Sequence, residues 1–300
     1  MVDQKKKKAL PIGVFDSGMG GLTVLRELVQ HLPQENFIYL GDTARLPYGT
    51  KSADTVNQYA TQMATILHDQ GIKLMVVACN TATTTALPTL RKRFPDIPIV
   101  GVVEPGAQAA VKATKNNSVA LLATETTIAS NIYQETLLHL NPNIDIASKS
   151  CGLFVALAEE GFVDDDIALH VTTHYLNALH QVNNHFDCLI LGCTHFPVLL
   201  SPIRKAIGEH VSIINSAQAT AQSVAALMME LDLNAASNQG ELQFLVTDLS
   251  DRFIRVGELF LGQSIAKNTV SLVDGVLEIT PSSASVMRPS FYDQESELSE

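Results

Sequence analysis

The chain has 300 residues, of which 46% are hydrophobic and 17% are charged, and it contains no Trp. This composition predicts a globular protein whose core is built from aliphatic residues, as in parallel α/β sheets. The net charge of −11 argues against a nucleic-acid-binding surface, because binding phosphates requires Lys and Arg. No stretch approaches the roughly 18 apolar residues that span a bilayer, so we expect a cytoplasmic protein that does not enter a membrane.

The N-terminal region carries a run of basic residues, Lys5 to Lys8, followed by a short apolar stretch. The stretch contains Pro11 and Gly13 and ends at Asp16 without the small-residue cleavage pattern of a signal peptide. We therefore expect the basic run to be a solvated cluster of charge.

Apolar runs of strand length alternate with helical patterns, which predicts a mostly parallel sheet with helices on both faces. The expected strands are Ile12–Phe15, Phe37–Leu40, Leu74–Ala78, Ile97–Val103, Val119–Ala123, Ile144–Ala147, Cys188–Leu191 and Val211–Ile214. The expected helices include Leu22–His31, Ala53–Asp69, Thr84–Phe94, Ala107–Lys115, Ser130–Leu140, Ile167–Val182, Val198–Glu209 and Ala217–Leu231. Eight such strands would also suffice for a single barrel. We expect a polar loop at Asn234–Gly240 and a frayed acidic end at Asp293–Glu300.

Two segments share one design, and this weak internal repeat predicts two halves of similar build. Leu74–Thr81 and Leu189–His195 each contain a buried strand that ends in Cys and is followed by small polar residues. Ligands of open α/β sheets bind beyond the carboxyl ends of the strands. We therefore expect Cys79 and Cys193 to meet at a cleft between the halves.

Cys79 and Cys193 are candidate catalytic thiols because both lie at strand-to-helix junctions rather than inside strands. The N-terminus of the following helix favours a thiolate at such a position. Asn80, Thr81 and Thr194 are expected to offer amide and hydroxyl contacts to a bound carboxylate. Core packing is the alternative for either Cys alone.

A zinc site is another interpretation of the Cys-Thr-His sequence at 193–195, with Cys79 as a further ligand. The tightly spaced ligand pairs of structural zinc are absent from the sequence, so we expect no metal. His195 is then a neighbour that tunes the Cys193 thiol or delivers a proton to it, or it is a histidine at a helix start.

The two other cysteines, Cys151 and Cys188, lie in apolar runs and are expected to be packing residues. No lysine occupies a strand-end turn of the kind where a pyridoxal Schiff base forms. We therefore expect no pyridoxal cofactor, and the resemblance given below implies that no other cofactor is needed.

The Gly-rich segment Asp16–Leu22 leaves a strand and opens a helix. Its spacing matches neither the dinucleotide fingerprint nor the phosphate loop. We expect a tight turn whose amides approach a small anion, with Asp16 placed to bind an ammonium group or to orient a thiol. Pure turn chemistry remains the alternative. Further along, Pro47–Gly49 predicts a loop with an exposable aromatic residue.

Four motifs in register resemble those of glutamate racemases, within the broader Asp/Glu racemase superfamily. They are Asp16–Val24, Pro47–Gly49, Cys79–Ala82 and Leu191–Pro197. The resemblance covers roughly residues 11 to 265 and implies two similar, mostly parallel-sheet α/β domains with the active site in the cleft between them. The first domain would comprise residues 1–105 plus 216–300, and the second residues 106–215.

The resemblance also implies roles for individual residues. The implied catalytic residues are Cys79, Cys193, Asp16, His195 and Glu159, with Asp16 assisting Cys79 and His195 assisting Cys193. The implied substrate contacts are Asp16, Ser17, Tyr48, Gly49, Asn80, Thr81, Thr124, Thr194 and His195. Glu160 and Thr127 are the alternatives to Glu159 and Thr124. The family often has proline where this chain has Gly152 and Ala156, which puts the geometry around Glu159 in question.

The activity implied is the interconversion of L- and D-glutamate by two thiols without a cofactor, supplying D-glutamate for peptidoglycan. The expected partner is a small-molecule substrate, with neither nucleic acid nor membrane, and a homodimer is left open.

Two alternative functions remain. One is an aspartate racemase or another isomerase of the superfamily, and the other is a non-enzymatic anion-binding module that uses the Gly-rich turn.

Overall fold

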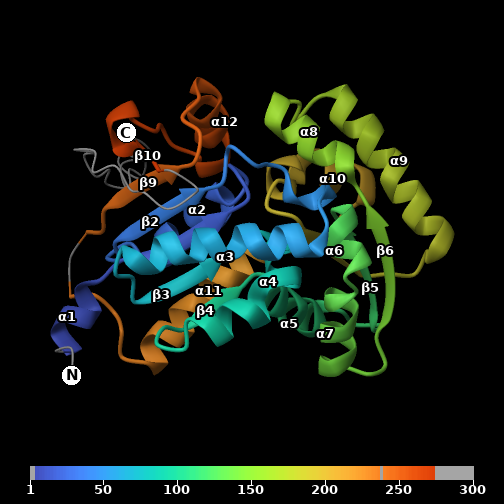
Figure 1. Cartoon of the computed structure of the whole chain (residues 1–300). Coiled ribbons are helices and arrows are strands. Elements are labelled where there is room, and N and C mark those ends of the chain that lie inside the picture. The colour runs from blue at the N-terminus through green and yellow to red at the C-terminus, as the bar shows by residue number, and fades with distance from the viewer. Residues whose placement is uncertain (1–3, 237–238, 274–300) are drawn as a thin grey trace, which may run out of the picture.

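Ten strands form two separate parallel sheets in the computed structural model, which describes residues 4–236 and 239–273 (Figure 1). Sheet A has the order β10-β9-β2-β1-β3-β4, and sheet B has the order β6-β5-β7-β8. The strands of sheet A are β1 (Ile12–Asp16), β2 (Phe37–Gly41), β3 (Leu74–Val77), β4 (Ile99–Gly101), β9 (Leu242–Val246) and β10 (Val270–Leu272). Those of sheet B are β5 (Ser118–Ala123), β6 (Asp145–Ser150), β7 (Cys188–Gly192) and β8 (Ser212–Asn215).

Helices cover both faces of each sheet. Sheet A packs against α2 (Leu22–His31), α11 (Ser216–Glu230) and α12 (Asp251–Leu261) on one face, and α3 (Ala53–Asp69) and α4 (Asn80–Arg93) on the other. Sheet B packs against α5 (Val103–Ala113) and α7 (Ile132–Leu140) on one face, and α8 (Gly152–Glu160), α9 (Asp166–Val182) and α10 (Leu200–Ile207) on the other. We call each sheet with its helices lobe A or lobe B.

The short elements complete the described chain. They are α1 (Gln4–Ala9), α6 (Glu125–Ala129) and the 3-10 helices η1 (Tyr48–Thr50), η2 (Phe196–Leu199) and η3 (Lys267–Thr269). No helix within residues 4–236 and 239–273 has both the length and the apolar character needed to cross a membrane.

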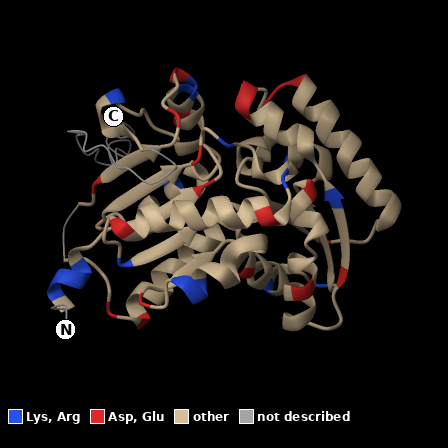
Figure 2. Ribbon diagram, viewed as in Figure 1, with Lys and Arg blue, Asp and Glu red and all other residues tan. Residues whose placement is uncertain are grey.

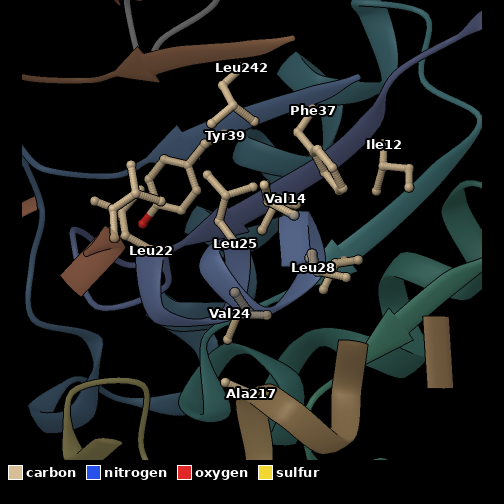
Figure 3. Close-up of a cluster of buried hydrophobic side chains, with 14 of the residues drawn as sticks. Ile12, Val14, Leu22, Val24, Leu25, Leu28, Phe37, Tyr39, Ala217 and Leu242 are labelled. Carbon is tan, nitrogen blue, oxygen red and sulfur yellow. The ribbon is translucent and has the colours of Figure 1, made fainter. Parts of the chain in front are cut away.

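The core of lobe A explains why β1 reads as a continuous apolar run. All five residues of β1 are buried, because the strand lies between β2 and β3 and has helices on both faces. Ile12 and Val14 face α2, whereas Phe15 belongs to the core under α3 and α4. Figure 3 shows the first of these cores, with β1, β2 and α2 contributing Ile12, Val14, Phe37, Tyr39, Leu22, Leu25 and Leu28.

The expected fold of two mostly parallel α/β units is confirmed, and the single barrel is wrong, because the strands divide between two open sheets. Each of the eight expected strands has a counterpart in the structure, although β4 is shorter than expected. It ends at Gly101 because α5 already begins at Val103, and Pro105 is tolerated within the first turn of that helix. The sequence reading missed β9, β10, α6 and α12. The acidic end expected at residues 293–300 lies outside the described residues.

The basic N-terminal run forms a helix, α1, in which no residue is buried, so the charges are solvated as expected. Lys8 Nζ lies 2.6 Å from Asp232 Oδ1, and the Lys8 carbonyl accepts a hydrogen bond from the buried Lys73 ammonium. Lys73 also pairs with the buried carboxylate of Glu35. These contacts hold α1 against the body of lobe A.

Candidate active site

The carboxyl ends of β1 and β3 in lobe A and of β5 and β7 in lobe B surround a cavity of about 340 Å³. Both lobes contribute side chains to its wall. The lining residues are Ser17, Leu46, Pro47, Tyr48, Gly49, Thr50, Cys79, Asn80, Thr81, Thr124, Glu125, Ser150, Gly152, Val155, Ala156, Glu159, Cys193, Thr194 and His195. The structure therefore brings Cys79 and Cys193 to one cavity, at the strand ends where the repeat predicted them.

Cys79 is the N-cap residue of α4, directly after the buried end of β3. Its Sγ accepts a hydrogen bond from the Ala82 amide at 3.4 Å, and the thiol donates to Ser17 Oγ at 3.5 Å. The side chain is buried but still borders the cavity. This is the position at which a helix N-terminus was expected to favour the thiolate.

Burial changes that expectation for Cys79. Removal from water, together with the nearby charges of Asp16 and Cys193, raises the pKa of the Cys79 thiol to about 12, although the bonds to Ser17 and Ala82 lower it. The expectation from the helix N-terminus alone gave the opposite direction, because it left out the cost of burying a charge. Without a ligand, the protein therefore keeps Cys79 as a thiol near neutral pH.

Cys193 lies at the end of a hydrogen-bonded chain of side chains. Its Sγ is 3.8 Å from Nδ1 of His195, and Nε2 of His195 is 3.0 Å from Oε1 of Glu159. Arg252 of lobe A donates to the other carboxylate oxygen of Glu159 at 3.0 Å. His195 therefore lies between a thiol and a carboxylate, which suits proton exchange with Cys193.

The charges along this chain support one another. Burial lowers the pKa of His195, but hydrogen bonds and charge interactions with Cys193 and Glu159 outweigh burial and raise it to about 10. Burial likewise raises the pKa of Glu159, but His195 and Arg252 hold it below its usual value. At neutral pH the pair is an imidazolium and a carboxylate, so the ring has a proton to give.

Asp16 lies behind the cavity wall at the end of β1 and is completely buried. Its Oδ2 accepts from the Gly18 amide at 3.0 Å, and Oδ1 has no hydrogen-bond partner within the described residues. Burial raises the pKa of Asp16, while the charge of His195 and three backbone amides oppose the rise. Asp16 acts on Cys79 as a neighbouring charge that raises the pKa of the thiol, and no direct hydrogen bond joins the two described side chains. The predicted assistance of Asp16 to Cys79 stays a prediction.

Glycines of the Gly-rich segment allow the lobes to approach. A Cβ on Gly20 would lie 2.4 Å from both His195 Nδ1 and Thr194 Oγ1, and one on Gly21 would lie 2.4 Å from Asp16 Cβ. The segment thus serves as a tight turn, and its position against His195 places it beside the hydrogen-bonded chain of Cys193, His195 and Glu159 in lobe B.

Three threonine hydroxyls form a cluster where β5 and α4 meet. Thr81 Oγ1 lies 3.0 Å from Thr124 Oγ1 and 3.2 Å from Thr127 Oγ1. Thr124 borders the cavity, whereas Thr127 is fully buried behind it. Gly49 packs against Thr124 so closely that a Cβ there would lie 2.8 Å from Thr124 Cβ. The geometry favours Thr124 over Thr127 as a substrate contact.

Asn80 is held by a residue that sequence reasoning missed. The hydroxyl of Tyr133, on α7, donates to Asn80 Oδ1 at 2.7 Å. The buried Asn80 Nδ2 has no hydrogen-bond partner in the part of the chain that the structure describes. Because the residue borders the cavity, this unpaired amide is a candidate donor to a bound carboxylate.

Tyr48 and Thr194 differ in how they serve the site. Tyr48 is buried rather than exposable. Its hydroxyl donates a hydrogen bond to Asp42, so the hydroxyl proton is not available to a substrate. Thr194 borders the cavity, and its carbonyl accepts from the Thr23 hydroxyl of α2 at 2.8 Å. That bond joins the two lobes next to His195.

Glu159, rather than Glu160, reaches the cavity. Glu159 is 11% exposed and contacts His195, whereas Glu160 is largely exposed and pairs with Arg252. Site residues that sequence reasoning did not name include Leu46, Thr50, Glu125, Ser150 and Val155 in the cavity wall, and Tyr133 and Arg252 behind it. None of the described cavity-lining residues is Lys or Arg, so a bound carboxylate would depend on amide and hydroxyl donors. In residues 4–236 and 239–273, no group of three or more His, Cys, Asp or Glu side chains is arranged to hold a metal.

Comparison with known proteins places this site in a family. The model of the Asp/Glu/hydantoin racemase family matches residues 12–224. The chain belongs to this family. Similar family members are the glutamate racemases of Geobacter metallireducens, 46% identical over 84% of this chain and 92% of the relative, and of Syntrophus aciditrophicus, 42% identical over 85% and 94%. The expected resemblance to glutamate racemases and the expectation of a racemase are confirmed.

Solved structures of this family share the fold. The glutamate racemase of Francisella tularensis, solved with D-glutamate, is 38% identical and superposes with a TM-score of 0.83 over 89% of this chain and 98% of its own. The RacE1 isoform of Bacillus anthracis is 36% identical, with a TM-score of 0.84 over the same shares. An aspartate racemase homologue from Pyrococcus horikoshii is 16% identical over 73% of this chain and 99% of its own, with a TM-score of 0.52, and therefore shares the fold alone.

Proposed function

We propose that this protein is a glutamate racemase that interconverts L- and D-glutamate by proton transfer between Cys79 and Cys193, without a cofactor. The observation that carries the proposal is that two thiols from different lobes border one cavity, one near Asp16 and the other near His195. The choice of glutamate rests on the similarity to glutamate racemases, one of which was solved with D-glutamate.

Racemisation removes the α-proton from one face of the substrate and delivers a proton to the other face. In one direction a thiolate takes the α-proton and becomes a thiol, while the opposing thiol protonates the carbanion and becomes a thiolate. The reverse direction exchanges the two roles. Because the pKa of Cys79 is about 12, its thiolate is scarce in the free enzyme but is a strong base once it forms.

The substrate carboxylates would be held by neutral donors. Asn80 Nδ2 is buried without a protein partner among the described residues, and the hydroxyls of Thr81 and Thr124 line the same wall. Negative charge develops on the α-carboxylate when the carbanion forms, so fixed donors at that point lower the barrier. Glu159 and His195 would supply and accept protons on the Cys193 side.

The deciding experiment is proton NMR of L-glutamate with the protein in D₂O. We expect the α-proton signal to disappear, and chiral chromatography to show an equal mixture of enantiomers at the end, because enantiomers have equal free energy. Faster exchange of aspartate would favour the rival superfamily racemase. Saturable glutamate binding without any deuterium incorporation would favour the anion-binding module, and either result would contradict the proposal.

The scheme uses no metal, so dialysis against a strong chelator should leave the rate of racemisation unchanged. We base this on the missing zinc-ligand spacing in the sequence. A rate that falls on dialysis and returns with zinc alone would contradict the scheme.

We further propose that the reaction takes place in the cytoplasm and supplies D-glutamate for peptidoglycan. A deletion strain without another source should then grow only when D-glutamate is added, and growth without it would contradict this role.

We also propose that the chain divides into two domains, residues 1–105 plus 216–300 and residues 106–215. Limited proteolysis tests this division, because cleavage should occur at the two connections between the domains. Light scattering of the purified protein decides whether a homodimer forms.

A further inference from the structure

An ion pair between the two lobes extends the hydrogen-bonded chain of Cys193, His195 and Glu159. Arg252 of α12, in lobe A, donates from Nη2 to Glu159 Oε2 at 3.0 Å and to Glu160 Oε1 at 3.0 Å, at the end of α8 in lobe B. Figure 2 shows the acidic end of α8 opposite the charged residues of α12. The same helix places the Phe260 ring 5.2 Å from the His195 ring, so α12 contacts two successive members of the chain.

We infer that Arg252 is a positioning residue for the proposed racemisation, acting on the Cys193 thiol through Glu159 and His195. The inference rests on the proposed function. Arg252 does not border the cavity, so it does not touch the substrate itself. Arg252 instead fixes the orientation of the Glu159 carboxylate.

The geometry of Glu159 shows how this works. Oε2 is held by Arg252, which leaves Oε1 to accept from Nε2 of His195 at 3.0 Å. A glutamate side chain has several rotatable bonds, and fixing it costs conformational entropy. A charge-assisted bond to a guanidinium offsets that cost and holds the carboxylate in one orientation. Without the guanidinium, the carboxylate is free to turn towards solvent.

The orientation of Glu159 in turn sets the protonation of the histidine. Because Nε2–H donates to Glu159, the nitrogen that faces Cys193 is Nδ1, at 3.8 Å from Sγ. Two charged groups face Glu159, namely His195 and Arg252. Asp16 and Cys193 interact electrostatically with His195. Among the described groups, Glu160 pairs only with Arg252. Arg252 therefore helps to keep a transferable proton at the atom next to the thiol.

Because Arg252 comes from the opposite lobe, the chain from arginine to thiol is complete only when the lobes hold their present separation. Closure of two lobes around a substrate is a common way to assemble a catalytic group. The ion pair thus joins the arrangement of the lobes to proton delivery at Cys193.

The test compares Arg252→Ala with Arg255→Ala, a matched change of an exposed arginine on the same helix. We expect kcat of Arg252→Ala to fall on the order of 10- to 100-fold, the cost of a misplaced catalytic group. KM should change little, because Arg252 does not border the cavity. Arg255→Ala should keep wild-type kinetics, and Arg252→Lys should recover part of the lost kcat.

Isotope effects distinguish this role from a structural one. The enantiomers have equal free energy, so kcat/KM must remain equal for both in every variant, and damage on one side cannot appear as a preference. It appears instead in the effect of α-deuteration on the rate. In Arg252→Ala this effect should increase for the enantiomer that Cys193 deprotonates and decrease for the other, whereas general loosening would change both alike.

The pH profile provides a second readout. Removing the cation beside Glu159 raises the pKa of that carboxyl, so the acid limb of the kcat profile should move to higher pH. Arg252→Lys should move it back. If Arg252→Ala does not fold, Arg252→Gln, which keeps a hydrogen-bond donor but no charge, should give the same isotope pattern and the same shift.

Two results would overturn the inference: kinetics of Arg252→Ala equal to those of Arg255→Ala, or a lower kcat with symmetric isotope effects and an unmoved acid limb. Failure of the proposed function is separate from either result, because it would appear as an absence of glutamate racemisation in the unmodified protein.

Discussion

At the scale of single residues, the two thiols share a cavity but have unlike neighbours. Cys79 lies near a buried carboxylate, whose negative charge helps to keep the thiol protonated, whereas Cys193 contacts a histidine whose pKa is raised to about 10. A carboxylate accepts protons and an imidazolium gives them. In the proposed reaction, the two faces of the substrate would therefore be served by different proton-handling groups, although the enantiomers are equal in energy.

The replacements Cys79→Ser and Cys193→Ser should each abolish racemisation, because a hydroxyl is far too weak a base near neutral pH. Each variant keeps one competent thiol. It should therefore still eliminate HCl from one enantiomer of a β-chloro glutamate analogue, since elimination needs a single base, and the two variants should prefer opposite enantiomers. Chloride release from each enantiomer measures this. Racemase activity close to wild type in either variant would disprove the two-thiol assignment.

His195 should make the stability of the fold depend on pH. Its pKa rises from 6.5 when unfolded to about 10 when folded, so the folded state binds the proton more tightly. The resulting stabilisation is fully present below pH 6.5 and is lost as the pH rises towards 10. Urea unfolding at pH 7 and pH 9.5 should show a larger loss for the wild type than for His195→Gln. Equal losses would mean that His195 is neutral in the folded protein.

The sequence revealed those site residues that fall in local motifs. Cys79, Cys193 and His195 stand directly after apolar strands, so the chemistry of a strand end could be predicted from their neighbours. Tyr133 and Arg252 lie in ordinary helical sequence, far along the chain from Asn80 and Glu159, their partners. Only the packing of one element against another gives them a role, and a single sequence carries no local signal for that.

At the scale of elements, the decisive feature is the junction between a buried parallel strand and the helix that follows it. β1, β3, β5 and β7 all end at the cavity, because parallel strands place their carboxyl ends at one edge of a sheet. The turn after β1 lies against the turn after β7 in the other lobe, because a Cβ on Gly20 would lie 2.4 Å from His195 Nδ1.

Gly20→Ala should therefore impair catalysis and also destabilise the fold. The new methyl group would lie 2.4 Å from His195 Nδ1, so the ring must move away from Cys193. We expect kcat to fall on the order of 100-fold, as for a displaced catalytic group. The free energy of unfolding should fall by about 1–3 kcal/mol, because the core is overpacked. Gly106→Ala in α5 is the matched control, because its nearest atoms lie at an ordinary 3.4 Å. Activity and urea midpoints decide, and a near-normal kcat for Gly20→Ala would contradict the proposed contact.

The sequence predicted eight strands because each is a run of apolar residues bounded by turns. It did not predict β9 and β10 at the edge of sheet A, nor α12. β9 is a short apolar run after a polar loop, and β10 has three residues, so neither stands out from an ordinary buried segment. The order of strands within each sheet was not predictable either, because β9 pairs with β2 across two hundred residues of chain.

At the scale of the whole molecule, the chain leaves lobe A after β4, builds lobe B, and returns through α11. This helix follows β8 directly but packs in the core beneath sheet A. Each lobe contributes one thiol to the cavity, Cys79 from lobe A and Cys193 from lobe B, so the cavity exists only where the lobes meet. Bonds across that junction, from Thr23 to Thr194 and from Arg252 to Glu159, connect the lobes next to the proposed catalytic groups.

The accessibility of the four cysteines tests this arrangement in the intact protein. Cys79 and Cys193 are 5% and 6% exposed and border the cavity, whereas Cys151 and Cys188 are completely buried in the cores of lobe B. Iodoacetamide should therefore modify Cys79 and Cys193 alone in the native protein, and faster at higher pH, because the thiolate is the reactive form. Peptide mass spectrometry locates the modification, with urea-unfolded protein as the control in which all four react.

Glutamate should protect both reactive thiols together, because one bound molecule would lie between the two lobes. The concentration that halves the rate of modification should be the same for Cys79 and for Cys193, and the same ligand should raise the midpoint of thermal unfolding, since it binds only the folded state. Protection of one thiol without the other would place them in separate sites. Modification of Cys188 in the native protein would show that lobe B opens in solution, and the geometry proposed for proton transfer would then not be the resting one.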